Sequence, residues 1–387
     1  MKLDTSSKDI YLDNAATTRV CREVASVVVA CMEEAYGNPA SAHHLGIAAE
    51  RLVGEAREKL LAAVGDPGGA HGDVIWTSGG TESDALGVMG AARARKKRGR
   101  HLLYSSIEHS AVRESINRLA RGGWDAAAIP AGASGVIDVA DLLARVTAET
   151  QVVALMLVNN EIGTIQPVAE AVAALRAAGR DVHVHCDAVQ ALGKIAVDVV
   201  ALGADTVAFS AHKIHGPKGS GALWVKKGTH LDAMWGGGGH QDGVRSGTLN
   251  VPGIAGLGEA VRLAESQRAG HTALWTGFGA TLIGAARAAG LDFRVNGDGA
   301  PRSPHVVSLA FQGVPAEPLL HTLESRGVMV SAGSACSERD RRPSPVLQAI
   351  ALPPDYGTVR LSFGHETTAA QVERAAAILV DAVKSFR

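Results

Sequence analysis

Short apolar runs alternate with amphipathic segments along most of this chain, and each run ends in a polar turn. The runs at 73–77, 101–105, 152–158 and 182–186 predict strands, and the segments between them predict helices. This alternation is typical of an α/β fold in which helices cover both faces of a mostly parallel sheet. Parallel strands share one direction, so their polar turns gather at one sheet edge, where such enzymes bind ligands.

The turn after the run 73–77 is rich in glycine and opens a helix, reading Ser78-Gly79-Gly80-Thr81-Glu82. Backbone N–H groups in a strand–turn–helix unit bind phosphate, and Thr81 can both cap the helix and offer a hydroxyl. The turn lacks the lysine of a Walker A loop, and no GxGxxG motif follows the first strand. Nucleoside triphosphate and dinucleotide sites are therefore disfavoured.

A second polar turn carries a lysine, Lys213, in the stretch 205–224, DTVAFSAHKIHGPKGSGALW. Ser210, His212 and Lys213 follow a buried strand at once, and Gly216-Pro217 forces a turn before another strand. A lysine beside apolar walls and a second cation loses proton affinity and becomes usable as a nucleophilic amine. A solvated loop lysine is the ordinary alternative, and only the neighbouring turns argue against it.

The other turns of the predicted edge supply His109, Asn160, Asp187 and Gln190. A pyridoxal phosphate site needs N–H groups and hydroxyls for the phosphate and a carboxylate for the pyridinium nitrogen. It also needs a lysine for the Schiff base and a ring that covers the face of the cofactor. The residues gathered at this edge therefore predict pyridoxal 5'-phosphate as the cofactor.

Composition excludes several other classes of protein. With 387 residues and a net charge of −1, the chain is long enough for two domains and is not expected to bind nucleic acid. No apolar run reaches membrane-spanning length, and the first residues carry no signal-peptide pattern. Four cysteines without a CxxC pair predict a reduced, cytoplasmic protein. No Cys/His cluster has zinc spacing and no GxSxG motif is present, so we expect neither a metal site nor a serine hydrolase.

Ten ordered motifs extend over essentially the whole chain: LDNAATT, YGNPAS, TSGGTESDAL, EHSAV, VNNEIGTIQP, HCDAVQALGK, FSAHKIHGPKG, GGGGHQDGVRSGTLN, GSAC and VRLSFG. In these motifs the chain resembles the cysteine desulfurases, members of the class V aminotransferase group of fold-type I pyridoxal phosphate enzymes. The resemblance implies a large cofactor-binding domain, 16–258, with a mostly parallel seven-stranded sheet. It also implies a smaller α+β domain formed by 1–15 and 259–387, which carries Cys336.

The resemblance implies a role for each matching position. Lys213 would form the Schiff base with the cofactor and move the α-proton of the substrate, and Cys336 would attack the substrate sulfur. His109 would stack on the cofactor ring and act as acid–base for the substrate thiol. The remaining implied contacts are Asp187 with the ring nitrogen, Gln190 with the phenolate oxygen, Gly80, Thr81, Ser210 and His212 with the phosphate, Asn160 with cofactor and substrate, and Asn38 and Arg360 with the substrate, Arg360 as a bidentate fork for its carboxylate.

The implied activity converts L-cysteine to L-alanine and leaves a persulfide on Cys336. This sulfur would pass to an acceptor protein for iron–sulfur cluster or other thio-cofactor biosynthesis. Thr248 matches the family's threonine that reaches the phosphate of the partner subunit, which implies a homodimer with shared sites. The segment 331–345 has the length of the family's flexible loop rather than its short, rigid one. The chain departs from the family at Ser337-Glu338 after GSAC, at His365, where arginine is frequent, and in lacking the longer tail that some members use to dock a scaffold protein.

Two other readings remain open. The first is another enzyme of the same fold, namely a selenocysteine lyase, an aminotransferase or a β-eliminating lyase. Cys336 discriminates here, because transamination needs no thiol nucleophile. The second is a non-catalytic sulfur-carrier or scaffold subunit that kept the fold, against which the intact Lys213 and Asp187 argue.

Overall fold

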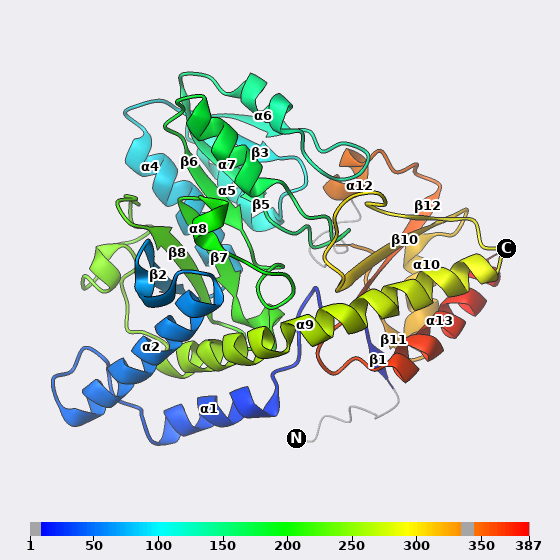
Figure 1. Cartoon of the computed structure of the whole chain (residues 1–387), viewed down its shortest axis with the longest axis horizontal. Helices are drawn as coiled ribbons and strands as arrows, with labels where there is room; N and C mark the ends of the chain where they lie inside the picture. Colours follow the sequence, from blue (N-terminus) through cyan, green and yellow to red (C-terminus); the bar gives the residue numbers. More distant parts are fainter. Residues whose placement is uncertain (1–8, 334–343, 387) are drawn as a thin grey trace.

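The computed structural model describes residues 9–333 and 344–386, so Cys336 lies outside the described residues (Figure 1). A seven-stranded sheet has the strand order β2-β8-β7-β6-β5-β3-β4. Only β8 runs antiparallel to its neighbours in this sheet. The predicted α/β fold with a mostly parallel seven-stranded sheet is confirmed. The strands are β2 (Gly72–Thr77), β3 (His101–Ser105), β4 (Asp125–Ile129), β5 (Thr150–Met156), β6 (His183–Asp187), β7 (Thr206–Ser210) and β8 (Gly221–Lys226).

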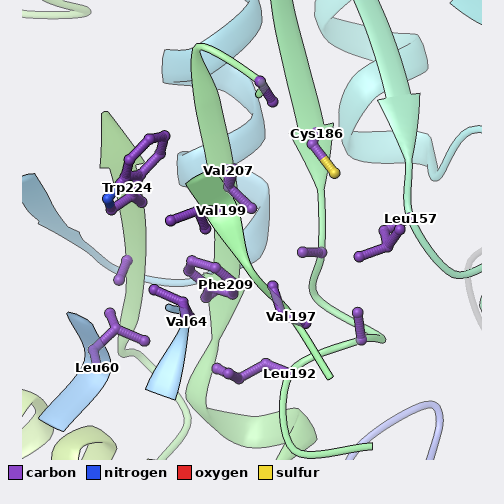
Figure 2. Close-up of a cluster of buried hydrophobic side chains, with 14 of the residues drawn as sticks. Leu60, Val64, Leu157, Cys186, Leu192, Val197, Val199, Val207, Phe209 and Trp224 are labelled. Carbon is purple, nitrogen blue, oxygen red and sulfur yellow. The ribbon is translucent and has the colours of Figure 1, made fainter. Parts of the chain in front are cut away.

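Two hydrophobic clusters lie on opposite faces of this sheet. Neighbouring strand residues point to opposite faces, and Val207 belongs to one cluster while Ala208 belongs to the other. Figure 2 shows Phe209 and Trp224 of the first cluster near Leu60 of α2. This face is covered by α1 (Arg22–Glu33), α2 (His44–Ala63), α6 (Val139–Arg145), α7 (Val168–Ala177) and α8 (Val199–Leu202), and the other by α3 (Gly80–Ala85), η2 (Leu86–Gly90), α4 (Ala91–Arg95) and α5 (Ser110–Arg121).

The C-terminal part has its own core around a three-stranded antiparallel sheet of order β12-β10-β9. The N-terminal β1 (Ile10–Tyr11) joins this part by pairing in parallel with β11 (Val328–Met329). The spacing of Thr368 and Gln371 predicts a capping box, and the structure has one at the start of the last helix, α13. The remaining elements are β9 (Phe293–Val295), β10 (Val306–Gln312), α10 (Ala316–Ser325), α12 (Pro345–Ala349), β12 (Tyr356–Ser362) and α13 (Ala369–Lys384).

One helix, α9 (Val251–Ala288), connects the two parts (Figure 1). The sequence predicts a helix only as far as Gln267, whereas α9 has 38 residues. Its first half packs in the core of the large sheet through Leu257, and its second half packs in the C-terminal core through Trp275. Because the two halves of α9 pack against different cores, no single apolar stripe continues along the whole helix. A prediction from apolar periodicity alone therefore ends the helix before its observed end. The predicted domain boundary at 258/259 falls within α9 and remains a prediction.

Among the described residues, no helix has both the length and the apolar composition needed to cross a bilayer.

Candidate active site

The carboxyl edge of the large sheet opens into a cavity of about 470 Å³. This volume lies in the range of small-molecule and cofactor sites. Two predicted site residues, Asn38 and Thr248, are exposed and do not line this cavity in the single subunit. The predicted site residues that do line it are Gly80, Thr81, His109, Asn160, Asp187, Gln190, Ser210, His212, Lys213 and Arg360.

Lys213 ends the short 3-10 turn that follows β7. Its Nζ donates hydrogen bonds to the carbonyl oxygens of Ala15 and Ala16, both at 2.6 Å. Gln190 Nε2 donates to the same Ala15 oxygen at 2.8 Å. The LDNAATT segment therefore forms a wall of the cavity beside the lysine, a placement that no local sequence pattern predicts.

The glycine-rich turn between β2 and α3 leaves its backbone open toward the cavity. Gly79 has φ 153°, a conformation in which a side chain would be strained. The turn also packs against the start of β8, since a Cβ at Gly221 would lie 2.5 Å from the Cα of Gly79. Ser210 Oγ is buried in the cavity wall and has no hydrogen-bond partner among the described residues. A buried hydroxyl beside helix-start N–H groups suits an anion with several acceptor oxygens, such as a phosphate.

His109 precedes α5 and caps it, because its Nδ1 accepts a hydrogen bond from the Ala111 N–H at 3.2 Å. Burial, and then the charges of Lys213 and Arg113, lower the pKa of His109 to about 4. The ring is therefore neutral near pH 7 and carries its proton on Nε2.

Asp187 ends β6 and is buried at the floor of the cavity. Burial, and then the nearby Asp84, raise the pKa of Asp187 to about 7. Asp84, His109 and Asp187 are the one group of His, Cys, Asp or Glu side chains with metal-ligand spacing in the part of the chain that the structure describes, their ligand atoms lying within 4.8 Å of one another. Carboxyls with raised pKa values hold protons in competition with a cation, so we keep the prediction of no metal site. The sequence analysis did not single out Asp84.

Arg360 of β12, in the three-stranded sheet, is buried and lines the cavity as well. One guanidinium nitrogen donates to the Asn160 carbonyl at 3.0 Å and another to Asp13 Oδ1 at 2.6 Å. The fork predicted to bind the substrate carboxylate therefore already contacts a carboxylate of the protein. A substrate carboxylate would have to share Arg360 with Asp13, and the role of Arg360 remains a prediction.

A second lysine, Lys194, lies buried behind the first. Its Nζ donates to Gln190 Oε1 at 3.0 Å, and His305 Nε2 lies 3.1 Å from the same oxygen. Burial, and then the charge of Lys213, lower the pKa of Lys194 well below its ordinary value. Lys194 was not among the predicted site residues, although it lies four positions after Gln190 in HCDAVQALGK.

The described residues on either side of 334–343 both meet Glu161, the neighbour of Asn160. Ser344 Oγ donates to Glu161 Oε2 at 2.5 Å. A Cβ at Gly333 would lie 2.8 Å from the same oxygen, so the backbone packs closely there. The described residues on both sides of 334–343 thus contact the neighbour of Asn160, which lines the cavity.

The fold and this set of residues define a class V aminotransferase. The family model described as "Aminotransferase class-V" matches residues 10–375, and the chain belongs to this family.

Within the family, the chain is 39% identical over 384 residues to the protein named cysteine desulfurase IscS of Anaeromyxobacter sp. (strain Fw109-5), covering 98% of this chain and 93% of the relative. Among solved structures, one titled "NIFS-LIKE PROTEIN" is similar with a TM-score of 0.89 and 32% identity, over 98% of this chain and 100% of the other. A structure titled "SspA in complex with cysteine" has a TM-score of 0.79 and 28% identity, over 92% and 99% of the two chains.

Proposed function

We propose that this protein is a cysteine desulfurase that uses pyridoxal 5'-phosphate to convert L-cysteine to L-alanine and transfers the sulfur to Cys336 as a persulfide. One observation carries the proposal: Lys213, Asp187 and His109 line the same cavity, at the carboxyl edge of the sheet. The full-length similarity to proteins named cysteine desulfurases, and to a structure titled with cysteine, supports the choice of substrate.

The residues present fit the cofactor. The Gly79–Gly80 turn and the unpartnered Ser210 hydroxyl would hold the phosphate, with Thr81 and His212 beside them. Asp187 would pair with the ring nitrogen. When bound, the cofactor supplies an electron sink for charge that develops at the substrate Cα.

The protein's own groups would then divide the work of the reaction. Lys213, oriented by the Ala15 and Ala16 carbonyls, moves the proton at the substrate Cα. The neutral His109 ring presents Nε2–H for proton transfer at the substrate sulfur. Arg360 orients the substrate carboxylate.

Sulfur transfer assigns the nucleophile to Cys336. Its thiolate bonds to the substrate sulfur, the carbon–sulfur bond breaks, and the carbon product leaves as alanine after protonation. The persulfide then serves an acceptor protein for iron–sulfur cluster or other thio-cofactor biosynthesis, in the cytoplasm.

We also propose a homodimer in which Thr248 completes the partner's phosphate site. Thr248 is exposed and outside the cavity of its own chain, and α1 exposes the apolar side chains Val29 and Met32. Mixing inactive Lys213→Ala and weakened Thr248→Ala subunits tests this arrangement. Shared sites predict that mixed dimers recover activity, because one of their two sites contains neither substitution. Mixtures no more active than the two separate variants would contradict shared sites.

The main test incubates the purified protein with L-cysteine and quantifies alanine and bound persulfide in wild type and Cys336→Ala. Alanine with stoichiometric persulfide, lost in the variant, is the expected result. Cys31→Ala, at a buried cysteine outside the cavity, is the control. A keto acid product, or activity on cysteine that survives Cys336→Ala, would instead favour another pyridoxal phosphate enzyme of this fold.

A further inference from the structure

Asp84 has no part in the proposed reaction, yet its carboxyl is buried and lies next to that of Asp187. It is carried by α3, on the face of the sheet toward which Asp187 points. Two carboxyls this close in a buried site cannot both be ionised at low cost. Which of them holds a proton decides whether Asp187 is available as an anion.

A chain of hydrogen bonds leads from Asp84 across the sheet. His183, His185 and Asp187 alternate along β6 and therefore face the same side. Asp84 Oδ1 lies 3.2 Å from His185 Nε2, and His185 Nδ1 lies 2.9 Å from Thr206 Oγ1. The same hydroxyl oxygen lies 3.0 Å from His183 Nε2.

The far end of this chain fixes its direction. The backbone of Gly87 interacts with the His183 ring and favours its protonated form, which is the effect of a nearby carbonyl oxygen, and a carbonyl oxygen can only accept. Since Nε2 of His183 faces Thr206, the donor to Gly87 is Nδ1. Burial lowers the pKa of His183 well below its ordinary value, so the ring is neutral and its Nε2 must accept the Thr206 proton.

The donor at His183 determines the donors at Thr206, His185 and Asp84 in turn. Thr206 has a single hydroxyl proton, already given to His183, so its oxygen accepts from Nδ1–H of His185. Burial lowers the pKa of His185 to about 4, and the neutral ring therefore has a bare Nε2. This nitrogen needs a donor, and Asp84 is the group placed to be one.

We infer that Asp84 is a neutral carboxylic acid that donates its proton to His185 and thereby leaves the negative charge of the carboxyl pair on Asp187. Asp84 is thus a positioning residue, acting through Asp187 on a bound ring nitrogen. Only this last step rests on the proposed function.

The surroundings of Asp84 agree with this assignment. Burial raises the pKa of Asp84 well above its ordinary value. Other ionisable groups nearby are Glu108, whose pKa burial also raises, and Lys213, whose charge favours the anion at Asp187. His109 lies within 4.8 Å of both carboxyls and is neutral near pH 7, because its pKa is lowered to about 4. A Cβ at Gly87 would lie 2.2 Å from His185 Nδ1, so a glycine at this position lets the His185 ring lie where Asp84 and Thr206 reach it.

Infrared difference spectroscopy of the full-length, cofactor-free protein tests the protonation directly. At about pH 8, where Asp187 is ionised, one protonated-carboxyl band of wild type should be lost in Asp84→Asn and retained in Asp187→Asn, while any band of Glu108 is common to all three proteins. The cofactor-free sample needs no turnover, so this readout is independent of whether the protein desulfurates cysteine. No loss of a protonated-carboxyl band in Asp84→Asn would overturn the inference.

A second pair of variants protects the test if Asp84→Asn does not fold. Thr206→Val removes the hydroxyl that links His183 and His185, so it interrupts the series of hydrogen bonds. It should therefore shift the carbonyl stretch of the protonated Asp84 carboxyl. Thr150→Val is the matched control, because the buried Thr150 hydroxyl contacts His101 Nδ1 at 2.7 Å without a link to Asp84. Equal spectra for Thr206→Val and wild type would contradict the proposed hydrogen-bond connection between Thr206 and Asp84.

Pyridoxal phosphate binding supplies a third readout. Asp84→Asn should leave the dissociation constant within about threefold of wild type, since it replaces one neutral donor by another. A larger loss of affinity would mean that Asp84 acts as an anion.

Discussion

Acidic and basic side chains gather in two groups at the cavity, and the two groups respond differently to burial. The acidic wall consists of Asp84 and Asp187, which line the cavity, together with Glu108 next to them, and burial raises the pKa of all three. The basic wall consists of Lys213 and Arg360, which line the cavity, together with Lys194, which contacts the lining residue Gln190. Its lysines donate to carbonyl-type oxygens of Gln190, Ala15 and Ala16, and Arg360 contacts a carboxylate of Asp13.

The comparison shows where a ligand can gain binding energy. On the acidic wall, burial outweighs the charge of Lys213 and favours neutral carboxyls, and a cationic ring nitrogen would stabilise the anion at Asp187. On the basic wall, neutral oxygens hold the amines in place without cancelling their charge. A ligand with a basic ring nitrogen and anionic groups therefore complements both sides, which is the chemistry that pyridoxal phosphate with cysteine offers.

Lys213→Ala removes the reactive amine of the basic wall and should reduce activity more than any other substitution considered. We expect alanine formation from L-cysteine to fall at least about 10³-fold, because both the nucleophilic amine and the proton carrier are lost. The control is Lys227→Ala, an exposed lysine beyond the far end of β8. Activity within about tenfold of wild type would rule out the proposed role of Lys213.

Asp187→Asn breaks the acidic wall and should weaken pyridoxal phosphate binding about 10- to 100-fold, the value of a charge-assisted hydrogen bond. Since the pKa of Asp187 is raised to about 7, wild-type affinity should fall as the pH drops through that value, and the variant should lack this dependence. Absorbance titrations at about pH 6 and about pH 8 measure both effects.

In the cofactor-free protein, Asp187→Asn should change the pH dependence of the unfolding free energy, which runs in the opposite direction to that of cofactor affinity. A carboxyl with a raised pKa contributes stability below its unfolded pKa, and this contribution is lost as the pH rises through about 7. Wild type should therefore lose stability over this range with a slope of at most about 1.4 kcal/mol per pH unit, and Asp187→Asn should flatten it. If urea unfolding gives wild type and Asp187→Asn the same change of unfolding free energy with pH, the raised pKa does not belong to Asp187.

Ser210→Ala sharpens the comparison at the phosphate turn between the walls. Removing a buried hydroxyl that has no partner among the described residues should leave the cofactor-free stability within about 0.5 kcal/mol of wild type. Cofactor affinity should fall about 5- to 10-fold, for one lost hydrogen bond. Ser220→Ala is the matched control, because its hydroxyl is equally buried and unpartnered among those residues but lies outside the cavity lining. Equal affinities for the two variants would count against a phosphate at Ser210.

Lys194→Met tests the basic wall behind the pocket and should have the smallest effect. Replacing this buried lysine by an apolar side chain of similar length should leave the free energy of unfolding near pH 7 unchanged or about 1 kcal/mol higher. Because burial lowers the pKa of Lys194 well below 10.5, wild type loses stability as the pH falls from that value toward the folded pKa. The variant should therefore lose less stability over this pH range than wild type or the exposed control Lys384→Met. A loss of more than about 2 kcal/mol near neutral pH would indicate that the charge is paired more strongly than these contacts suggest.

Most of the predicted site residues meet in one cavity because each follows a strand of the same sheet. Asn38 and Thr248 lie outside it in the single subunit, and their roles in the site remain predictions. The partners missed from the sequence, Asp13, Asp84 and Lys194, belong to segments with other local explanations. Asp13 follows a short strand, and Asp84 lies within a helix.

The sequence by itself determined the alternation of strands and helices, the glycine-rich turn at Gly79–Gly80, the capping box at Thr368 and the family. These features depend on residues a few positions apart, so periodicity and turn chemistry are enough to predict them. Only the tertiary structure decided which charges face one another. Asp84 meets His185, and Arg360 meets Asp13, because of strand order and of packing between distant segments. Burial then sets the protonation of these groups, and burial is a property of the folded chain rather than of any local stretch.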